Sequence, residues 1–473
     1  MTANEATCDV GVIGLGVMGG HLARNLGSRG YGVCGYNRDV DRAHQLAESH
    51  PEAKLTVATG FEELTRRLSR PRRLLLLVPA GDPVDQVLDS LDPLLDEGDV
   101  VVDGGNSLFS DTNRRFERSI SRPWTFMGMG ISGGAEGALH GPSMMPGGDR
   151  EAWASLQPML ESIAAKTDSG PCVAWCGHRS AGHFVKMVHN GIEYAEMQHL
   201  SEAMLLLRRG LGLEAEAVAD LMSEWNEGRL GSFLVEITAE ILRTPDPESP
   251  DTPIVDAILD RAGQKGTGRW TAQAALELAV ATPSITAAVD ARVLSAQLEL
   301  RKRAENLLDG ESREPLEDIT PSDVHAALLA GRILTWSQGF SLLATASDAF
   351  DYETPLPEIA RIWKGGCIIR ARLLDDACPA LESDSPIPLV FDEPFRGMLR
   401  ETRTACRRLV AAAARSGIAT PGLAASLGWL ETLATARGGA SLIQAQRDRF
   451  GSHRFERVDD PGRLVHHDWS RSP

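Results

Sequence analysis

The chain has 473 residues and a formal net charge of −17 at pH 7, from 65 acidic and 48 basic side chains. A chain of this length is expected to form two or three domains with large cores. The negative charge argues against nucleic acid and against an anionic membrane surface as partners, since both need a basic face. An anionic small molecule remains compatible if the cations are gathered in one place.

The seven cysteines are odd in number, and none stands in a CxxC pair. This usage predicts free thiols in a reducing compartment, and the CVAWC segment at 172–176 has the wrong spacing for a zinc site. The first residues lack the basic region and apolar run of a secretion signal, and no run of about 18 apolar residues follows. We therefore expect a cytoplasmic protein without a membrane segment.

Strand and helix signals alternate over about the first 180 residues. Short runs rich in Val and Leu, each typical of a buried strand, occupy residues 8–16, 31–37, 72–80 and 98–106. A helical pattern follows the first run as far as about Gly30. Buried strands with helices between them predict an α/β, Rossmann-like domain on a parallel doubly wound sheet over residues 1–180.

A glycine motif follows the first predicted strand and opens the first predicted helix. Gly14 would permit a tight turn, Gly16 would let the backbone approach a pyrophosphate, and Gly19 would allow close helix packing. A purely structural glycine turn is the alternative, but the flanking strand and helix favour a dinucleotide site. The residues of this motif predicted to bind the cofactor are Gly14, Leu15, Gly16, Val17, Met18 and Gly19.

The end of the second predicted strand, Asn37-Arg38-Asp39, bears on which nicotinamide cofactor is bound. An acid at this point holds the ribose hydroxyl of NAD, whereas Arg accommodates the additional phosphate of NADP. Arg38 can pair with that phosphate and stack on the adenine, which favours NADP. Asp39 places a negative charge beside the same phosphate, so NAD stays open as a second cofactor.

The character of the chain changes near residue 181. Stretches rich in Ala and Leu at 183–209, 331–349 and 400–416 have helical spacing, which predicts a large all-α domain over residues 181–437. Proline-rich segments at 244–253 and 378–394 are expected to be surface loops within it. The last segment, 438–473, is slightly basic and has few apolar residues with which to fold alone.

One face of the helix predicted to begin near residue 183 carries four versatile polar side chains: Lys186, His189, Asn190 and Glu193. At about 100° per residue they form one stripe, and the opposite side carries apolar residues such as Phe184, Val188 and Ile192. A stripe of this kind is most often a solvated face. His and Asn, however, are weak helix formers that would add nothing to such a face, so a functional cavity is the second alternative.

Six segments together resemble the long form of the decarboxylating 6-phosphogluconate dehydrogenase family. They are DGGN at 103–106, FMGMGISGGAEGALHGPSMMPGG at 126–148, the polar helix, KGTGRWT at 265–271, GGCIIRA at 365–371 and IQAQRDRFGSH at 443–453. The resemblance implies oxidation of 6-phosphogluconate by NADP, loss of carbon dioxide and release of ribulose 5-phosphate, in the pentose phosphate pathway. No metal is required, because a β-keto acid loses carbon dioxide once an acid neutralises the forming enolate.

The resemblance gives two residues of the stripe catalytic roles. Lys186 would take the proton of the 3-hydroxyl and later return a proton to the ketone oxygen, and Glu193 would protonate the enediol carbon. Lys186 must then be neutral at some point near pH 7, which requires burial and cationic neighbours. The two groups would titrate as a coupled pair.

The resemblance also implies the groups that hold the substrate and the remaining cofactor contacts. Asn106 would lie near both nicotinamide and substrate, and Val78 and Ala80 would contact the cofactor. The implied substrate-binding residues are Asn106, Ser132, Gly133, Gly134, His189, Asn190, Tyr194, Lys265, Arg292, Arg447 and His453. The last two lie in the tail at 438–473, which in this family completes the site of the neighbouring subunit, so a homodimer is expected.

Two positions depart from the family pattern. The family commonly has Ser or Thr where this chain has Asp39, and Lys where it has Pro79, and both changes remove help for the cofactor's phosphate. Two other functions fit the sequence less well. A β-hydroxyacid dehydrogenase for a small acid would have about 300 residues and no phosphate-binding arginines, and a non-catalytic cofactor-binding regulator would be expected to lose Lys186 or Glu193 first.

Overall fold

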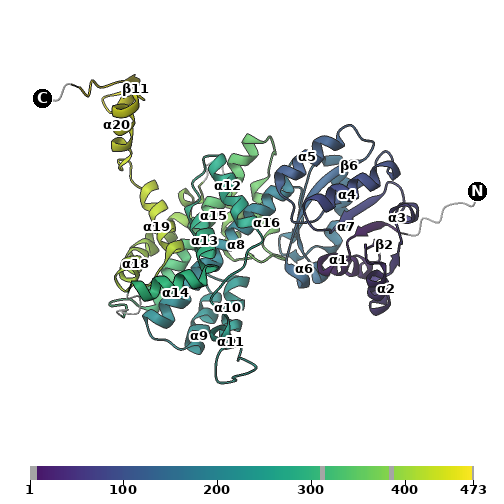
Figure 1. The fold of residues 1–473 in the computed structure, drawn as a ribbon, viewed down its shortest axis with the longest axis horizontal. Coiled ribbons are helices and arrows are strands. Elements are labelled where there is room, and N and C mark those ends of the chain that lie inside the picture. The colour runs from purple at the N-terminus through teal and green to yellow at the C-terminus, as the bar shows by residue number, and fades with distance from the viewer. Residues whose placement is uncertain (1–7, 309–314, 383–387, 471–473) are drawn as a thin grey trace, which may run out of the picture. The chain divides into compact units, whose positions relative to one another are not determined.

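A computed structural model describes residues 8–308, 315–382 and 388–470 of the chain (Figure 1). The chain forms two compact units, residues 1–426 and residues 427–473. The division predicted from the sequence, at 180 and 437, is finer and stays a prediction.

The first unit begins with a seven-stranded sheet. Its strands are β1 (Val10–Ile13), β2 (Val33–Tyr36), β3 (Leu55–Val57), β4 (Arg73–Leu76), β5 (Val100–Asp103), β6 (Thr125–Ser132) and β7 (Ser143–Gly147). They lie in the order β3-β2-β1-β4-β5-β6-β7, and all pairs are parallel except β6 with β7. The predicted parallel doubly wound sheet is confirmed, with one antiparallel edge strand that was not predicted.

Helices cover both faces of the sheet, because each connection between parallel strands crosses over a face. On one side α1 (Val17–Ser28) packs with α6 (Gly134–His140) and α7 (Arg150–Ile163) over a core that contains Leu22, Leu26 and Leu156. On the other, α3 (Phe61–Arg67), α4 (Asp82–Leu91) and α5 (Phe109–Ser119) enclose a second core. The short helix α2 (Val40–Ser49) follows β2. Strands β1, β2, β4 and β5 therefore end along one edge of the sheet, where such folds bind ligands.

The rest of the first unit is helical. Its helices are α8 (Ala181–Leu205), α9 (Ala215–Asn226), α10 (Phe233–Arg243), α11 (Ile254–Ala257), α12 (Thr267–Glu277), α13 (Pro283–Ser295), α14 (Leu298–Leu307), α15 (Pro321–Ala349), α16 (Leu356–Ile362), α17 (Leu373–Leu381) and α18 (Phe395–Arg415). Helix α19 (Pro421–Leu433) begins in this unit and continues into the second. The predicted helical region is confirmed.

Helix α8 is the central element of this region. It packs against α15, α12 and α13 and also against strands β6 and β7, so it joins the helical region to the sheet (Figure 1). Its own side chains are buried on nearly all sides. The predicted apolar side, with Phe184, Val188 and Ile192, is buried, and neighbouring elements also cover much of the polar side.

Two predicted boundaries differ from the structure. Helix α15 begins ten residues before the predicted 331, at a capping box of Thr320 and Asp323 with Pro321 in the first turn. In the proline-rich segment 378–394, residues 378–381 form the last turn of α17 with Pro379 inside the helix, and Leu389 and Val390 are buried. That segment is therefore not a surface loop at these residues, whereas 244–253 does form an exposed connection between α10 and α11. Residues 383–387 lie outside the described ranges.

The second unit contains the end of α19, then α20 (Ala440–Gly451) and a hairpin of β10 (Phe455–Arg457) and β11 (Asp460–Val465). The buried carboxylate of Asp448 accepts hydrogen bonds from the backbone of Arg454 and His467 and from the indole of Trp469. Several large apolar side chains of the unit are exposed, among them Leu442, Ile443 and Phe450. None of the described helices of either unit is long and apolar enough to span a membrane.

Candidate active site

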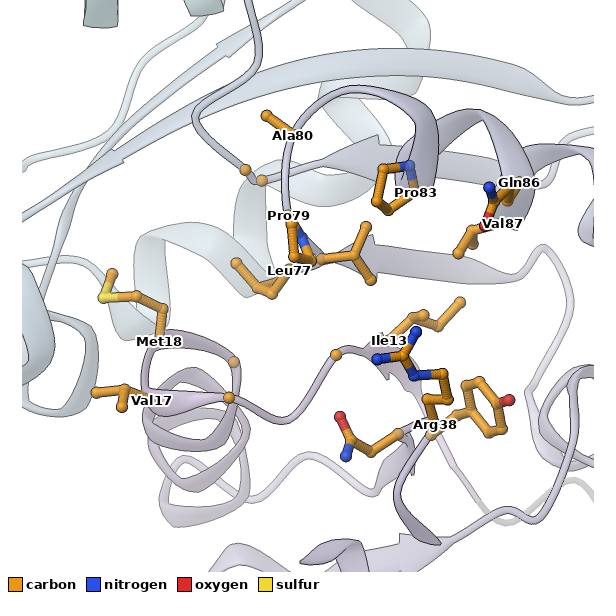
Figure 2. A pocket seen from close by; sticks show the side chains of 18 of the residues that line it. Ile13, Val17, Met18, Arg38, Leu77, Pro79, Ala80, Pro83, Gln86 and Val87 are labelled. Carbon is orange, nitrogen blue, oxygen red and sulfur yellow. The ribbon is translucent and has the colours of Figure 1, made fainter. Parts of the chain in front are cut away.

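A cavity of about 860 Å³ lies at the carboxyl ends of β1, β2, β4 and β5 (Figure 2). It has the size expected of a small-molecule or cofactor site. Figure 2 shows Val17 and Met18 on one side of it, Leu77, Pro79 and Ala80 on the loop after β4, and Arg38 reaching in from the end of β2.

The turn between β1 and α1 can be built only with glycines. Gly14 has φ +94°, and a Cβ atom there would lie 2.7 Å from the carbonyl oxygen of Leu77. A Cβ atom on Gly19 would lie 1.9 Å from the carbonyl oxygen of Gly14. Gly16, in contrast, lines the cavity, and apart from its chain neighbours no described residue has an atom within 4 Å of its ideal Cβ position. The backbone at the start of α1 is therefore open to a ligand, as a pyrophosphate requires.

Most of the predicted cofactor residues lie on this cavity. The exception is Leu15, whose side chain is buried in the core while its backbone N–H donates to Asn37 Oδ1 at 3.1 Å. The predicted residues that line it are Gly14, Gly16, Val17, Met18, Gly19, Asn37, Arg38, Asp39, Val78, Ala80 and Asn106.

The structure gives Asp39 a second role. It is the N-cap of α2, and its Oδ1 accepts a hydrogen bond of 3.2 Å from the backbone N–H of Arg42. This bond engages one carboxylate oxygen with the helix N-terminus, which stabilises the charge there. Asp39 still lines the cavity, so its charge remains near any phosphate bound beside Arg38.

Sequence reasoning missed Arg42, which also lines the cavity. Among the residues that the structure describes, neither Arg38 nor Arg42 has an ion-pair partner, whereas Arg72, Arg114 and Arg115 on the same domain are all paired with aspartates. Arg42 lies in the first turn of α2, four residues after Arg38 and close to the end of the second predicted strand, and that position was the available signal. The cavity thus has two arginines without an ion-pair partner among the described residues at one end, with Asp39 beside them.

Other walls of the cavity come from elements that carry no motif. The rings of Tyr36 and Phe61 are 4.6 Å apart and form an apolar wall, and Gln86 and Ser90 project from α4. Pro79 lines the cavity where the family commonly has Lys. These residues become neighbours only through the folding of α3 and α4 against the sheet.

The polar stripe of α8 forms a connected cluster. Lys186 Nζ lies 3.4 Å from His189 Nδ1, which is 3.1 Å from Asn190 Oδ1, and His189 Nε2 lies 3.1 Å from Ser132 Oγ. Lys186 is only 7% exposed and His189 is fully buried, while the Glu193 side chain is 24% exposed. The solvated-face alternative is therefore wrong for Lys186 and His189.

Close packing brings this cluster to the edge of the cavity. A Cβ atom on Gly130 of β6 would lie 2.3 Å from Cβ of Lys186, so α8 can approach the strand only because Gly130 has no side chain. The next residue, Ile131, lines the cavity, and Ser132 after it contacts His189. Three consecutive residues of β6 thus connect the cavity to Lys186 and His189.

Burial dominates the electrostatics of the cluster. It lowers the pKa of Lys186, whereas Glu193 and Cys367 act in the opposite direction. It also lowers the pKa of His189 well below the usual value, an effect to which Lys186 adds, and it raises the pKa of Glu193 against the influence of Lys186 and Arg292. The expected cationic neighbours of Lys186 do not contribute, because the charged groups acting on it raise its pKa. Desolvation favours a neutral amine and a neutral carboxylic acid.

The GISGG turn lies beside this cluster. Gly133 and Gly134 have φ values of +112° and +64°, which favour glycine, and a Cβ atom on Gly133 would lie 2.6 Å from the carbonyl oxygen of Gly366. The segment GGCIIRA, which contains Gly366, therefore packs directly on the turn. Asn106 is exposed and shares the cavity wall with Gly105.

The predicted phosphate-binding residues are brought together only in part. The Arg292 guanidinium stacks over the Tyr194 ring at 3.8 Å, and Gly268 packs so closely on that ring that a Cβ atom there would lie 2.6 Å from it. Lys265, three residues before Gly268, is exposed. Arg447 and His453 are exposed and belong to the second unit, and their place in the site stays a prediction.

Comparison with known proteins identifies both parts of the chain. Residues 9–177 match the model for the NAD binding domain of 6-phosphogluconate dehydrogenase, and residues 182–469 match that for the 6-phosphogluconate dehydrogenase C-terminal domain. The decarboxylating enzyme of Synechococcus elongatus is 45% identical over 97% of this chain and 98% of its own length. The NADP(+)-dependent decarboxylating enzyme of Bacillus subtilis is 41% identical over 98% and 99%.

A solved structure agrees with these matches. Plasmodium falciparum 6-phosphogluconate dehydrogenase, solved in its apo form and in complex with NADP+ and with 6-phosphogluconate, has a TM-score of 0.94 to this chain at 36% sequence identity. The match covers 98% of this chain and 100% of the other. Sequence, fold and site geometry agree that the chain belongs to the 6-phosphogluconate dehydrogenase family.

Proposed function

We propose that this protein catalyses the oxidative decarboxylation of 6-phospho-D-gluconate to D-ribulose 5-phosphate and carbon dioxide, with NADP as the oxidant. The observation that carries the proposal is the buried Lys186–His189 pair with Glu193 beside it, connected through β6 to a cofactor-sized cavity. Full-length relatives named for this reaction support it.

The cavity fits a nicotinamide dinucleotide. The open backbone at Gly16 would receive the pyrophosphate, and the Tyr36–Phe61 wall offers an apolar surface to the adenine. Arg38 and Arg42 would hold the 2′-phosphate of NADP in place of the missing lysine at Pro79. NADP bound here accepts the hydride from the substrate. NAD lacks that phosphate, and it remains a second, weaker cofactor in this proposal.

Lys186 would carry the proton through the reaction. As a neutral amine it takes the proton of the substrate's 3-hydroxyl while the C3 hydride departs, which leaves a 3-keto acid and a charged Lys186. The C1–C2 bond then breaks to release carbon dioxide, and Lys186 returns a proton to the oxygen on C3 to give a neutral enediol. Burial supports the first step because it lowers the pKa of Lys186.

Glu193 would complete the reaction as an acid. It donates a proton to the former C2 of the substrate, which becomes C1 of ribulose 5-phosphate. Lys186 accepts the proton of the hydroxyl on the former C3, which becomes the ketone, so the pair ends with the proton on Lys186. Burial raises the pKa of Glu193, which favours its protonated form. The transferred protons stay within the pair until product leaves, and the pair titrates as one unit.

The substrate would be held by groups around this pair. Ser132, Gly133 and Gly134 would bind the carboxylate through a hydroxyl and backbone N–H groups, and Asn106 would lie between nicotinamide and substrate. His189 and Asn190 would hydrogen-bond substrate hydroxyl and carboxylate groups. The phosphate would lie among Tyr194, Lys265, Arg292, Arg447 and His453.

The protein is proposed to act as a homodimer in which the tail of one subunit completes the site of its partner. Apolar side chains are exposed on α12, α13 and α14, for example Leu276, Leu294 and Leu307, and on the second unit, where Phe450 is 76% exposed. Contiguous apolar surface of this kind marks protein interfaces, and these side chains would contribute to it in the proposed dimer. A cytoplasmic location, expected from the cysteine usage, stays a prediction.

The direct test is to incubate the purified protein with 6-phosphogluconate and either NADP or NAD, and to follow reduced cofactor and carbon dioxide together. Equal amounts of both products, with NADP preferred, are expected. Reduced cofactor without carbon dioxide would instead indicate a simple hydroxyacid dehydrogenase, and the proposal would fail. The matches over the whole chain, together with the retained Lys186 and Glu193, leave no observation that favours a non-catalytic regulator.

A further inference from the structure

His183 lies on α8 one turn before Lys186, and neither the resemblance nor the proposed reaction uses it. It is 2% exposed. Its Nδ1 lies 2.7 Å from the hydroxyl of Thr112 on α5, a short hydrogen bond within the buried interior. Its other nitrogen, Nε2, is buried and has no hydrogen-bond partner among the described residues.

The contact between His183 and Thr112 depends on a third element. A Cβ atom on Gly128 of β6 would lie 2.6 Å from Thr112 Cγ2 and 2.8 Å from His183 Nδ1. The strand therefore leaves the space in which α5 and α8 meet. Gly128 precedes Gly130, which gives Lys186 its space in the same way, so α8 is in close contact with β6 at two successive points.

His183 is also connected to the loop that ends β5, because its partner Thr112 lies in the first turn of α5, which follows that loop directly. Burial lowers the pKa of His183, and the Asp103 charge and the backbone of Gly105 act in the opposite direction. The loop is itself held by Asp103, whose carboxylate accepts from the Gly105 N–H at 3.0 Å and from the Ser107 hydroxyl at 2.6 Å. This is the loop whose residues 104–106 line the cofactor cavity.

His183 thus lies between two parts of the site, the 104–106 loop and Lys186. The hydride leaves C3 of the substrate and the proton leaves the oxygen on C3. The loop, which lines the cofactor cavity, and Lys186, which takes the proton, must therefore keep fixed positions relative to each other. Helix α8 carries one of these groups, and the β5–α5 connection carries the other. His183 and Thr112 join the two elements directly.

We infer that His183 is a positioning residue, which holds Lys186 and the 104–106 loop in register for simultaneous removal of hydride and proton. The inference rests on the proposed function. His183 exchanges no proton with the substrate in this account, and its effect is geometric. Misplacement of reacting groups by about 1 Å can slow a reaction on the order of 100-fold.

The chain provides a matched control. His199 lies on the same helix, is also 2% exposed, and makes one hydrogen bond, from Nε2 to the Ser426 hydroxyl at 3.2 Å, while its Nδ1 has no partner within the described ranges. It is distant in sequence from Lys186 and from the β5 loop. The pair His199–Ser426 therefore resembles the pair His183–Thr112 in burial and bonding but not in location.

The test compares His183→Gln and Thr112→Val with His199→Gln and Ser426→Ala in the full-length protein. We expect both variants of the first pair to lower kcat by about tenfold or more with KM for the sugar acid changed less than about threefold. The primary deuterium isotope effect, measured with 6-phosphogluconate deuterated at C3, should rise because hydride transfer becomes slower than the other steps. NADP affinity, measured by quenching of protein fluorescence, should not change.

The control pair should lower Tm or raise KM without changing the isotope effect. An unchanged isotope effect in folded His183→Gln and Thr112→Val variants would overturn the inference, as would the same rise in the His199 and Ser426 variants. Should one variant of the first pair fail to fold, the other decides. A wild-type protein that forms no carbon dioxide would overturn the proposed function and this inference together, whereas active wild type with unaffected variants would overturn the inference alone.

Discussion

Lys186 Nζ lies 3.4 Å from His189 Nδ1, and both side chains are buried between α8 and β6. In water this pair would carry a positive charge, and burial disfavours that charge because it lowers the pKa of both groups. A neutral amine that can accept a proton is the chemical requirement of the proposed reaction, and the packing around Lys186 favours that form.

The first prediction distinguishes the role of Lys186 from that of Glu193. Glu193→Gln removes the carboxyl that raises the pKa of Lys186, so the neutral form of Lys186, which accepts the proton, is favoured at least as much as in the wild type. A stopped-flow trace should therefore retain a first-turnover burst of reduced NADP. Steady-state turnover should fall by about 100-fold or more, since the acid for the last protonation is lost.

Glu202→Gln is the matched control for this variant. Glu202 is on the same helix, is fully buried and also has a pKa raised by burial, but its carboxylate accepts from the backbone N–H groups of Gly422 and Leu423. It should change stability and leave the ratio of burst to steady state intact. Loss of the burst in Glu193→Gln would contradict the assignment of proton removal to Lys186 alone.

The second prediction concerns cofactor choice. Arg42→Ala should weaken NADP binding by about tenfold, the effect of one charge-assisted hydrogen bond, and leave NAD binding unchanged. Isothermal titration calorimetry measures both constants, and Arg29→Ala, an exposed arginine that does not line the cavity, is the control. Equal losses for NADP and NAD would exclude Arg42 as a phosphate ligand.

A related variant tests the role of Asp39. Serine can still accept the Arg42 N–H bond at the N-cap of α2 but carries no charge. Asp39→Ser should therefore raise the NADP-to-NAD affinity ratio with little change in Tm. A fall in the ratio would mean that Asp39 does not oppose the phosphate.

The third prediction tests the shared site. A Lys186→Met subunit keeps its tail, and an Arg447→Ala subunit keeps its Lys186. If tails cross between subunits, mixed dimers contain one complete site, and unfolding and refolding the two variants together should restore up to about a quarter of wild-type activity, because half of the random dimers are mixed and each has one of two sites. Activity no greater than the sum of the two variants refolded separately would show that each tail serves its own subunit.

Several features of the site could be read from the sequence, and the reasons are physical. The Val- and Leu-rich runs predict parallel strands because such strands are buried on both faces. Gly14 is required by its own φ of +94° and Gly19 by the carbonyl oxygen of Gly14, and both reasons lie within the motif. The stripe from Lys186 to Glu193 could be predicted because helical periodicity alone places these side chains on one side of the helix.

What could not be predicted depends on contacts between distant segments. The burial of Lys186 requires β6, and the contact of His183 with Thr112 joins positions 71 residues apart. Gln86 and Ser90 reach the cavity only because α4 packs beside β4. The start of α15 was different: Thr320, Pro321 and Asp323 are a local capping signal, and it can be recognised from sequence.

The fourth prediction links the pKa of Lys186 to stability. The pKa of Lys186 is lower in the folded protein than its unfolded value of 10.5. At a pH between these two values the unfolded chain binds more protons than the folded one, so the contribution of Lys186 to the free energy of unfolding rises with pH. Lys186→Met removes the cost of the buried charge, and its gain in Tm should therefore be largest at low pH. Calorimetry between about pH 6 and pH 10 should show this gain shrinking as the pH rises. A pH-independent difference would contradict the depressed pKa.

The most direct test of the central claim is single-turnover kinetics of Lys186→Met with 6-phosphogluconate and NADP. The account predicts that reduced NADP and carbon dioxide both fall by about 1,000-fold or more, while NADP binding measured by fluorescence stays at the wild-type value. Formation of reduced NADP at a rate within about tenfold of wild type would show that another group removes the hydroxyl proton, and the assignment of Lys186 as proton carrier would be wrong.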